Sequence, residues 1–189
     1  MKIVVASGNA HKIREIERIL EGFELVSMRE MGFDGEIEEN GSSFKENAYI
    51  KAKFIAEMFN MPALADDSGL CVDYLRGAPG VYSARYSGGD DRENRLLLLK
   101  NLENADTRTA RFRCAVCLCF PDGKAIFGEG ECKGRILFKD TGTGGFGYDP
   151  IFFSNDLKKS FAAASEEEKN SVSHRFRALK DLSRKFSHP

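Results

Sequence analysis

Residues 2–12 read Lys-Ile-Val-Val-Ala-Ser-Gly-Asn-Ala-His-Lys, and this stretch decides the start of the fold. The β-branched, apolar run at 2–6 predicts a short buried strand. Ser7-Gly8-Asn9 predicts a turn, and the spacing of the following isoleucines predicts a helix from about residue 10 to 21. A strand that passes through a small turn into a helix indicates an α/β architecture.

The same turn is a candidate anion site. Backbone N–H groups at the start of a helix and the helix dipole both favour phosphate. Lys12 lies in the first predicted helical turn and adds a point charge. The stretch lacks the Gly-x-x-x-x-Gly-Lys-Ser/Thr pattern of a Walker A loop. Phosphate binding and a plain capped turn are both open at this point.

The rest of the chain predicts alternating helices and strands, with hairpins in its second half. Capping boxes at Ser43–Glu46 and Ser165–Glu168 predict the starts of two helices. We expect Asp66-Asp67-Ser68-Gly69 to form a turn between two short strands. The predicted helices are about 43–59, 91–103 and 165–186, and the further strands about 23–26, 63–65, 70–72, 109–120, 124–136 and 151–153. Together they predict a mixed α+β or α/β fold on a mixed sheet, within a single domain over 1–189.

Composition excludes several classes of protein. The 189 residues are 42% hydrophobic, which is enough for a core, and the net charge is −1. A near-neutral chain is not expected to bind a nucleic-acid polymer through bulk electrostatics. No apolar run reaches the about 20 residues that span a bilayer, and the N-terminus predicts no signal peptide. We therefore expect a cytoplasmic protein with no membrane partner.

The five cysteines are expected to be structural. Cys114 and Cys117 have the spacing of half a zinc site, but they lie on a predicted strand. Residues three apart on a strand point to opposite faces, so these two thiolates are poorly placed to share an ion. We expect buried, reduced thiols.

Adjacent carboxylates at Asp66-Asp67 are difficult to explain by packing. Apolar residues flank them, and burying unpaired carboxylates is costly. Mg²⁺ prefers carboxylate oxygens together with substrate phosphates. Glu36, Glu38 and Glu39 form a second acidic group. Solvated loops explain Glu36 and Glu38 well, and Asp67 less well.

A glycine-rich segment spans 142–150 and contains a formal Gly-x-Gly-x-x-Gly match. We reject a dinucleotide loop, because Pro150 and a predicted strand follow where that motif needs a helix. A loop that exposes Phe146 and Tyr148 beside Asp149 is suited to cradling a base. The alternative is a β-turn whose aromatics belong to the core.

Three polar residues interrupt the predicted C-terminal helix: Lys169, His174 and Arg175. Their positions do not all share one helical face. They can act at one site only if the helix is broken or kinked. A solvated or structural role is the alternative for each.

Six motifs now stand in order along nearly the whole chain, and together they resemble the inosine triphosphate pyrophosphatase family. They are Ser7-Gly8-Asn9-x-x-Lys12; Glu39-x-Gly41-x-x-Phe44-x-Glu46-Asn47-Ala48-x-x-Lys51-Ala52; Ala65-Asp66-Asp67-Ser68-Gly69-Leu70; Gly77-Ala78-Pro79-Gly80-x-x-Ser83-Ala84-Arg85-Tyr86; Gly145-Phe146-Gly147-Tyr148-Asp149-Pro150; and Glu168-Lys169-Asn170-x-x-Ser173-His174-Arg175.

The resemblance implies a Mg²⁺-dependent enzyme that converts ITP, dITP and XTP into monophosphate and pyrophosphate, removing deaminated purines from the nucleotide pool. It also implies an elongated mixed-sheet α/β fold with two lobes around a central cleft, and a homodimer.

The resemblance also implies roles for single residues. Glu39 and Asp67 match metal-binding carboxylates, and Asp67 matches the catalytic base that activates water. Lys51 matches a phosphate-side lysine, and Ser68 flanks Asp67 in the same motif. The triphosphate segment matches Ser7, Gly8, Asn9, Ala10, His11 and Lys12. The nucleoside loop matches Phe146, Gly147, Tyr148 and Asp149, and base recognition matches Lys169, His174 and Arg175.

Some positions depart from the family pattern. Ala163 and Ala164 replace a Glu-Leu or Glu-Met pair, and Phe176 replaces a frequent glycine. Two other functions stay open from the residues alone. One is a pyrophosphatase for other modified or pyrimidine triphosphates, and the other is a nucleotide-binding module without catalysis.

Overall fold

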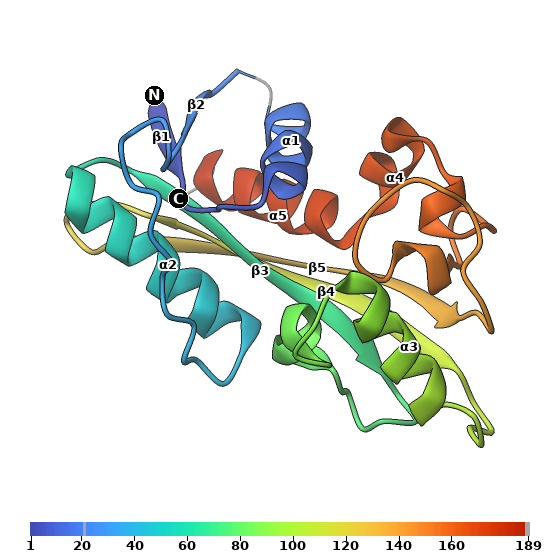
Figure 1. The fold of residues 1–189 in the computed structure, drawn as a ribbon. Helices are drawn as coiled ribbons and strands as arrows, with labels where there is room; N and C mark the ends of the chain where they lie inside the picture. The colour runs from blue at the N-terminus through green and yellow to red at the C-terminus, as the bar shows by residue number, and fades with distance from the viewer. Residues whose placement is uncertain (21, 188–189) are drawn as a thin grey trace. The chain divides into compact units, whose positions relative to one another are not determined.

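The computed structural model describes residues 1–20 and 22–187, whose six strands form one mixed sheet in the order β2-β1-β3-β4-β5-β6 (Figure 1). The strands are β1 Lys2–Val5, β2 Glu24–Ser27, β3 Ala63–Val72, β4 Thr109–Cys119, β5 Ala125–Ile136 and β6 Phe152–Ser154. The α-helices are α1 Ala10–Ile19, α2 Phe44–Phe59, α3 Asp91–Asn101, α4 Glu166–Val172 and α5 His174–Ser187. Short 3₁₀ helices are η1 Gly80–Arg85, η2 Asp149–Ile151 and η3 Phe161–Ala163.

Pairing within the sheet is of both kinds. β1 is parallel to β2, with Val4 opposite Val26, and parallel to β3, with Val4 opposite Ala63. β5 and β6 are antiparallel, with Arg135 opposite Phe153. Parallel neighbours need a crossover connection, and α1 supplies it from β1 to β2. The predicted mixed α/β fold is confirmed.

The chain divides into two compact units, each built from separate segments. Unit 1 contains residues 1–67, 114–130 and the segment from Arg175 onward. Unit 2 contains residues 68–113 and 131–174. Neither unit is one continuous piece of chain.

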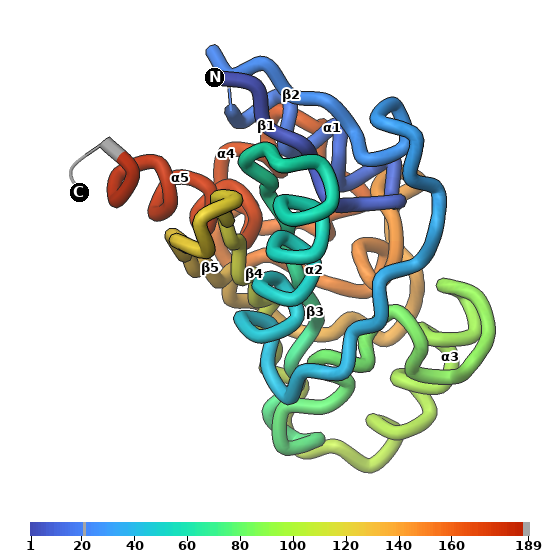
Figure 2. The backbone as a smooth tube through the Cα atoms, turned by 90° about the vertical axis from the view of Figure 1, so that its left-hand side faces the viewer, coloured from blue at the N-terminus to red at the C-terminus, as the bar shows by residue number. Residues whose placement is uncertain are grey.

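In unit 1, β1 is covered on both faces. Ile3 and Val5 pack with Ile16 of α1 and Leu179 of α5, whereas Val4 packs with α2 residues such as Ala52. This explains the continuous apolar run at 3–6, because a strand buried on both faces has no polar side. Both ends of the chain thus contribute to unit 1, through β1 and α5 (Figure 2).

Unit 2 has its own aromatic core. Phe112 of β4 packs edge-on against Phe152, with ring centroids 4.7 Å apart, and lies parallel to Phe161. Leu98 of α3 and Leu70 of β3 complete this cluster. None of the described helices is long and apolar enough to cross a membrane.

The turn predicted at Asp66-Asp67-Ser68-Gly69 is wrong. These residues lie inside β3, which runs unbroken from Ala63 to Val72. Lys12 and Arg175 pair with the buried Asp66, whereas the buried Asp67 accepts from Asn47 and lies 3.9 Å from Lys51. The polar composition imitates a turn, whereas ion pairing makes an extended conformation stable.

The C-terminal helix differs from the prediction in a second way. The Ser165–Glu168 capping box is confirmed, but the helix ends at Val172 and a new one begins at His174. Ser173 breaks it with an extended backbone at φ −63° and ψ 157°. The predicted end of α1 at residue 21 falls outside the described residues. At α2, Ser43 caps the helix as predicted, but the Glu46 carboxylate accepts from Ser42 instead of closing the box.

All five cysteines are reduced. Four are buried, and Cys71 is half-buried. Burial raises the pKa of the Cys117 thiol to about 12 and raises the pKa of the Cys114 thiol as well. The prediction of buried, reduced thiols is confirmed for Cys114 and Cys117.

Candidate active site

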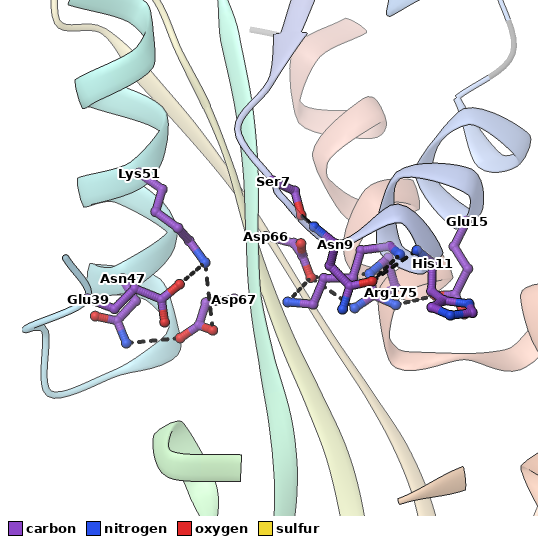
Figure 3. Close-up of polar contacts among 11 residues, drawn as sticks. Ser7, Asn9, His11, Glu15, Glu39, Asn47, Lys51, Asp66, Asp67 and Arg175 are labelled. Atoms are coloured by element: carbon purple, nitrogen blue, oxygen red, sulfur yellow. Dashed lines mark hydrogen bonds and ion pairs between the residues drawn. The ribbon is translucent and has the colours of Figure 1, made fainter. Parts of the chain in front are cut away.

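Two polar clusters of unit 1 meet β3 from opposite sides (Figure 3). Successive side chains on a strand point to opposite faces, so Asp66 and Asp67 enter different clusters. Asp67 faces α2, and Asp66 faces α1 and the start of α5.

The first cluster joins two carboxylates through one lysine. Lys51 Nζ lies 2.5 Å from Glu39 Oε1 and 3.9 Å from Asp67 Oδ1. Asn47, one turn before Lys51 on α2, donates from Nδ2 to Asp67 Oδ2 at 3.0 Å. The spacing of four residues places Asn47 and Lys51 on one face of the helix. Three predicted site residues, Glu39, Lys51 and Asp67, therefore come together.

Burial raises the pKa of the Asp67 carboxyl above its usual value. The negative charge of Glu39 raises it further, while Lys51 and Lys12 oppose the shift. The carboxylate that raises the Asp67 pKa is therefore Glu39 and not the adjacent Asp66. Asp66 lies on the other face of the strand with its own cations.

The second cluster surrounds Asp66. Arg175 donates to Asp66 Oδ2 from Nη2 at 2.9 Å and from Nε at 3.2 Å, and Lys12 Nζ lies 3.2 Å away. Arg175 also pairs with Glu15 of α1. Its side chain is only 1% exposed, as is that of Asp66.

Charges in this cluster compensate for burial. Burial alone would neutralise Asp66, but Lys12 and Arg175 hold the pKa of its carboxyl well below the usual range. Burial likewise opposes a charged Arg175, and Asp66 and Glu15 raise the pKa of its guanidinium. Both groups are therefore charged, and each depends on the other.

Asn9 organises the predicted phosphate segment at the start of α1. Its side chain accepts from the backbone N–H of His11 at 2.9 Å and of Lys12 at 3.3 Å. Its own N–H donates to Ser7 Oγ at 3.2 Å. Gly8 precedes this cap and Ala10 is the first helical residue. The capped turn is confirmed, and it directs helical N–H groups and Lys12 to the same end of α1.

In unit 2, Asp149 and Lys169 form a buried ion pair. Lys169 Nζ lies 2.7 Å from Asp149 Oδ2, which also accepts from the N–H of Phe146 at 2.9 Å. The ammonium sits 4.5 Å from the centroid of the Phe146 ring. Gly145 has to be glycine here, because its φ is +72° and a Cβ would lie 2.4 Å from Asp149.

The prediction that this loop exposes Tyr148 is wrong. Tyr148 is buried in the unit 2 core, and its hydroxyl donates to the carbonyl of Ser83 at 2.9 Å. Burial raises the pKa of this phenol. Phe146 is half-buried, so the loop offers one aromatic face at most.

His174 begins α5 and lies flat against Phe112. The ring centroids are 4.8 Å apart and the planes differ by 13°. No sequence motif indicated that Phe112 contacts a candidate site residue, because its position in β4 is typical of a core residue. Ser68 is half-buried on β3, directly after Asp67.

A family model described as the Ham1 family matches residues 3–185. The chain belongs to the Ham1 family. The chain is 50% identical over 184 residues to the dITP/XTP pyrophosphatase of Geobacter sulfurreducens, covering 94% of this chain and 92% of that protein. It is 48% identical to the dITP/XTP pyrophosphatase of Halalkalibacterium halodurans, covering 95% of each chain.

Solved structures agree with this family membership. The Staphylococcus aureus Ham1 protein superposes with a TM-score of 0.89 at 39% identity, covering 99% of this chain and 98% of that one. A nucleoside-triphosphatase / dITP/XTP pyrophosphatase from Mycobacterium abscessus gives 0.79 at 45% identity, covering 96% and 98%. The resemblance drawn from the six motifs is confirmed.

Within this Ham1 family chain, the break at Ser173 divides the predicted base-recognition trio. Lys169 and His174 belong to unit 2, whereas the Arg175 guanidinium is held by Asp66 and Glu15 in unit 1. Sequence reasoning missed Asn47 and Glu15. Helical spacing could have indicated both, because Asn47 lies four residues before Lys51 and Glu15 three after Lys12.

The donor set suits the Mg²⁺ that the resemblance implies. Among residues 1–20 and 22–187, no three His, Cys, Asp or Glu side chains group as a closed metal site. However, Glu39 and Asp67 converge on one cation, the Lys51 ammonium. Mg²⁺ commonly uses one or two protein carboxylates and takes its other ligands from water and substrate phosphates. Two carboxylates are therefore enough for a metal that arrives with a nucleotide.

Proposed function

We propose that this Ham1 family chain hydrolyses non-canonical purine nucleoside triphosphates, namely dITP, ITP and XTP, to the monophosphate and pyrophosphate. The observation that carries the proposal is the group Glu39–Lys51–Asp67, in which Lys51 and Asp67 are buried. In this group a carboxyl with a raised pKa lies beside a cation, and the chain is about half identical to dITP/XTP pyrophosphatases.

Water must attack the α-phosphorus while pyrophosphate leaves. Mg²⁺ held by Glu39 and Asp67 would neutralise the phosphate charge in this reaction. Asp67 accepts the proton of the attacking water on its carboxylate. Because burial raises its pKa, Asp67 is a stronger base than an ordinary aspartate. Asn47 holds Oδ2 of that carboxylate and so sets its orientation.

The start of α1 binds the triphosphate. The segment Ser7–Lys12 offers backbone N–H groups, the positive end of the helix and the Lys12 ammonium. Lys51 contributes a second cation, and its pKa is raised because Asp66, Asp67 and Glu39 outweigh the effect of burial. Lys51 therefore remains charged at neutral pH, and it binds the leaving pyrophosphate together with Lys12.

We assign recognition of the base to the residues that the resemblance implies for it. Lys169 and His174 supply hydrogen-bond donors, and Phe146 supplies an apolar face. Hypoxanthine and xanthine carry a keto acceptor at position 6, where adenine carries an amino donor. A hydrogen-bond donor that faces position 2 can bind the keto group of xanthine but leaves the amino group of guanine unpaired. The cost of this unpaired group is enough to discriminate against GTP. Arg175 stays a predicted member of this group, with its guanidinium committed to Asp66 and Glu15.

Pyrophosphate release from a panel of triphosphates tests the proposal. We expect ITP, dITP and XTP to be cleaved at least about a hundredfold faster than ATP and GTP, and only with Mg²⁺. Equal rates on all purines would contradict the donor-lined pocket. Preference for a pyrimidine triphosphate would indicate a related pyrophosphatase, and binding without pyrophosphate release would indicate a non-catalytic module.

The proposal includes a homodimer of cytoplasmic chains, as the resemblance implies. Light scattering on the purified chain measures its mass directly. A mass near twice 21.1 kDa supports the dimer, and a mass equal to one chain contradicts it.

A further inference from the structure

Both backbone polar groups of Gly147 are held by side chains of α3. The N–H of Gly147 donates to Asp91 Oδ2 at 2.9 Å, and its carbonyl accepts from Arg95 Nη1 at 2.9 Å. Asp91 and Arg95 are four residues apart, so one face of α3 presents both groups. All three residues belong to unit 2.

The Arg95 guanidinium is itself fixed by a second partner. Its Nε and Nη2 form a fork on Asp140, with Nη2 at 2.9 Å from Oδ2 and Nε at 3.1 Å from Oδ1. A bidentate pair of this kind restricts the plane of the guanidinium. Arg95 therefore reaches Gly147 from a defined direction, and its side chain is only 14% exposed.

The loop has an intrinsic need for such anchors. Gly142, Gly145 and Gly147 all have positive φ, at +92°, +72° and +58°. Glycine loses more conformational freedom on folding than any other residue, so a loop of this composition is costly to hold in one shape. At its other end, Asp149 closes the turn by accepting from Phe146 N–H. Charge-assisted hydrogen bonds from α3 hold the loop at Gly147.

We propose that Asp91 and Arg95, with Asp140 behind Arg95, are positioning residues that hold the 145–149 loop in its nucleoside-binding conformation. This inference rests on the proposed function, because that function assigns Phe146–Asp149 to the nucleoside. Neither side chain belongs to the catalytic group in unit 1. Loss of the clamp therefore weakens nucleoside binding and selectivity, and leaves the chemical step intact.

Amide hydrogen exchange without substrate tests the clamp directly. We compare Arg95→Met with Arg92→Met, which removes the same charge from an exposed position on the same helix. Peptides covering 142–149 should exchange about tenfold faster in Arg95→Met than in the unmodified chain. In the control variant their exchange rate should not change. Arg95→Lys keeps the positive charge but loses the bidentate pair with Asp140, so its exchange rate should lie between those of the other two variants. Peptides from β4 report whether each variant remains folded.

Steady-state kinetics with XTP and GTP test the role in binding. In Arg95→Met and Asp91→Ala we expect KM for XTP to rise about tenfold with kcat within about twofold, and the preference for XTP over GTP to narrow. Unchanged exchange in 142–149 overturns the clamp. Faster exchange with unchanged KM and selectivity overturns its role in nucleoside binding.

The two proposals fail in different ways. If the unmodified chain releases no pyrophosphate from any triphosphate, the proposed function is wrong, and the clamp is judged by exchange alone. If the unmodified chain is active and the variants match it in every measurement, the clamp is wrong and the function stands.

Discussion

The carboxylates of Asp66 and Asp67 lie on opposite faces of β3, although the two residues are neighbours in the sequence (Figure 3). Asp66 is held by Arg175 and Lys12, and its pKa is lowered. Asp67 is held by Asn47 near Lys51, and its pKa is raised. One dipeptide thus supplies a permanent structural anion and a group able to take a proton.

Asp67→Asn separates activity from stability. We expect the rate of XTP cleavage to fall by at least about 10²-fold, because the amide cannot accept the proton of water. The pKa of Asp67 is raised in the folded chain, so its ionised form costs stability at neutral pH. The free energy of unfolding in urea should therefore stay equal or increase. A variant with near-normal turnover would exclude Asp67 as the base.

Asp66→Asn should have the opposite effect on the free energy of unfolding. The buried Arg175 guanidinium loses the carboxylate that accepts from both its Nε and its Nη2, and we expect the free energy of unfolding at pH 7 to fall by about 3–5 kcal/mol. Asp73→Asn is the matched control, since its pair with Arg111 is 2.6 Å long but exposed. That control should cost less than about 1 kcal/mol.

The Asp66 effect also depends on pH with a defined sign. A carboxyl whose pKa is lower in the folded state stabilises the fold above its unfolded pKa of 3.8. This stability is lost as the pH falls below that value. The difference in unfolding free energy between the unmodified chain and Asp66→Asn should therefore shrink when urea titrations move from pH 7 to pH 3. A constant difference would contradict the charge argument.

Lys51→Met should move the acid limb of the pH–rate profile. Lys51 is the charge that most lowers the pKa of Asp67, against burial and Glu39. Without Lys51, Asp67 stays protonated up to a higher pH. As the pH is lowered, kcat/KM of the variant should therefore begin to fall at a higher pH than kcat/KM of the unmodified chain. Lys53→Met is the control, because Lys53 is exposed on the same helix and pairs with Glu57 at 3.8 Å. Coincident profiles for all three proteins would refute the coupling.

Asn9 can be tested for capping and for phosphate binding separately. Asn9→Ala removes the acceptor for two helical N–H groups and should lower the unfolding free energy by about 1 kcal/mol. Asn9→Asp keeps that acceptor and adds a negative charge. It should keep stability but raise KM for the triphosphate about tenfold, because the new charge repels phosphate. An unchanged KM in Asn9→Asp would place the triphosphate elsewhere.

The sequence was sufficient for the elements whose signals are local. The apolar run before Ser7, the Asn9 turn and the helical spacing after it predict β1 and α1, because each depends on neighbours along the chain. β3 was misjudged because its stability depends on a distant residue. Arg175, 109 residues from Asp66, supplies the charge that keeps the carboxylate in a buried strand.

The candidate site was likewise predictable in part, where motifs marked its residues, and unpredictable where distant residues form its contacts. Motif order placed Glu39, Lys51 and Asp67 in one function, and the structure brings these three together. The partners of Arg175 were not predictable from the residues around it. Arg175 lies two residues after a break at Ser173, which ends one helix inside an otherwise periodic segment. The Phe112 stack on His174 likewise joins two residues that no local pattern connects.

The return of α5 to β1 has a consequence for synthesis on the ribosome. Leu179 and Leu182 pack with Ile3 and Ile16, and Arg175 pairs with Glu15 across 160 positions of the chain. β1 and α1 therefore stay without their full core until α5 has been synthesised. The segments of unit 2 are complete by residue 174, so unit 2 can finish folding before unit 1. We therefore expect the buried Arg175–Asp66 pair to form after most of the contacts within unit 2.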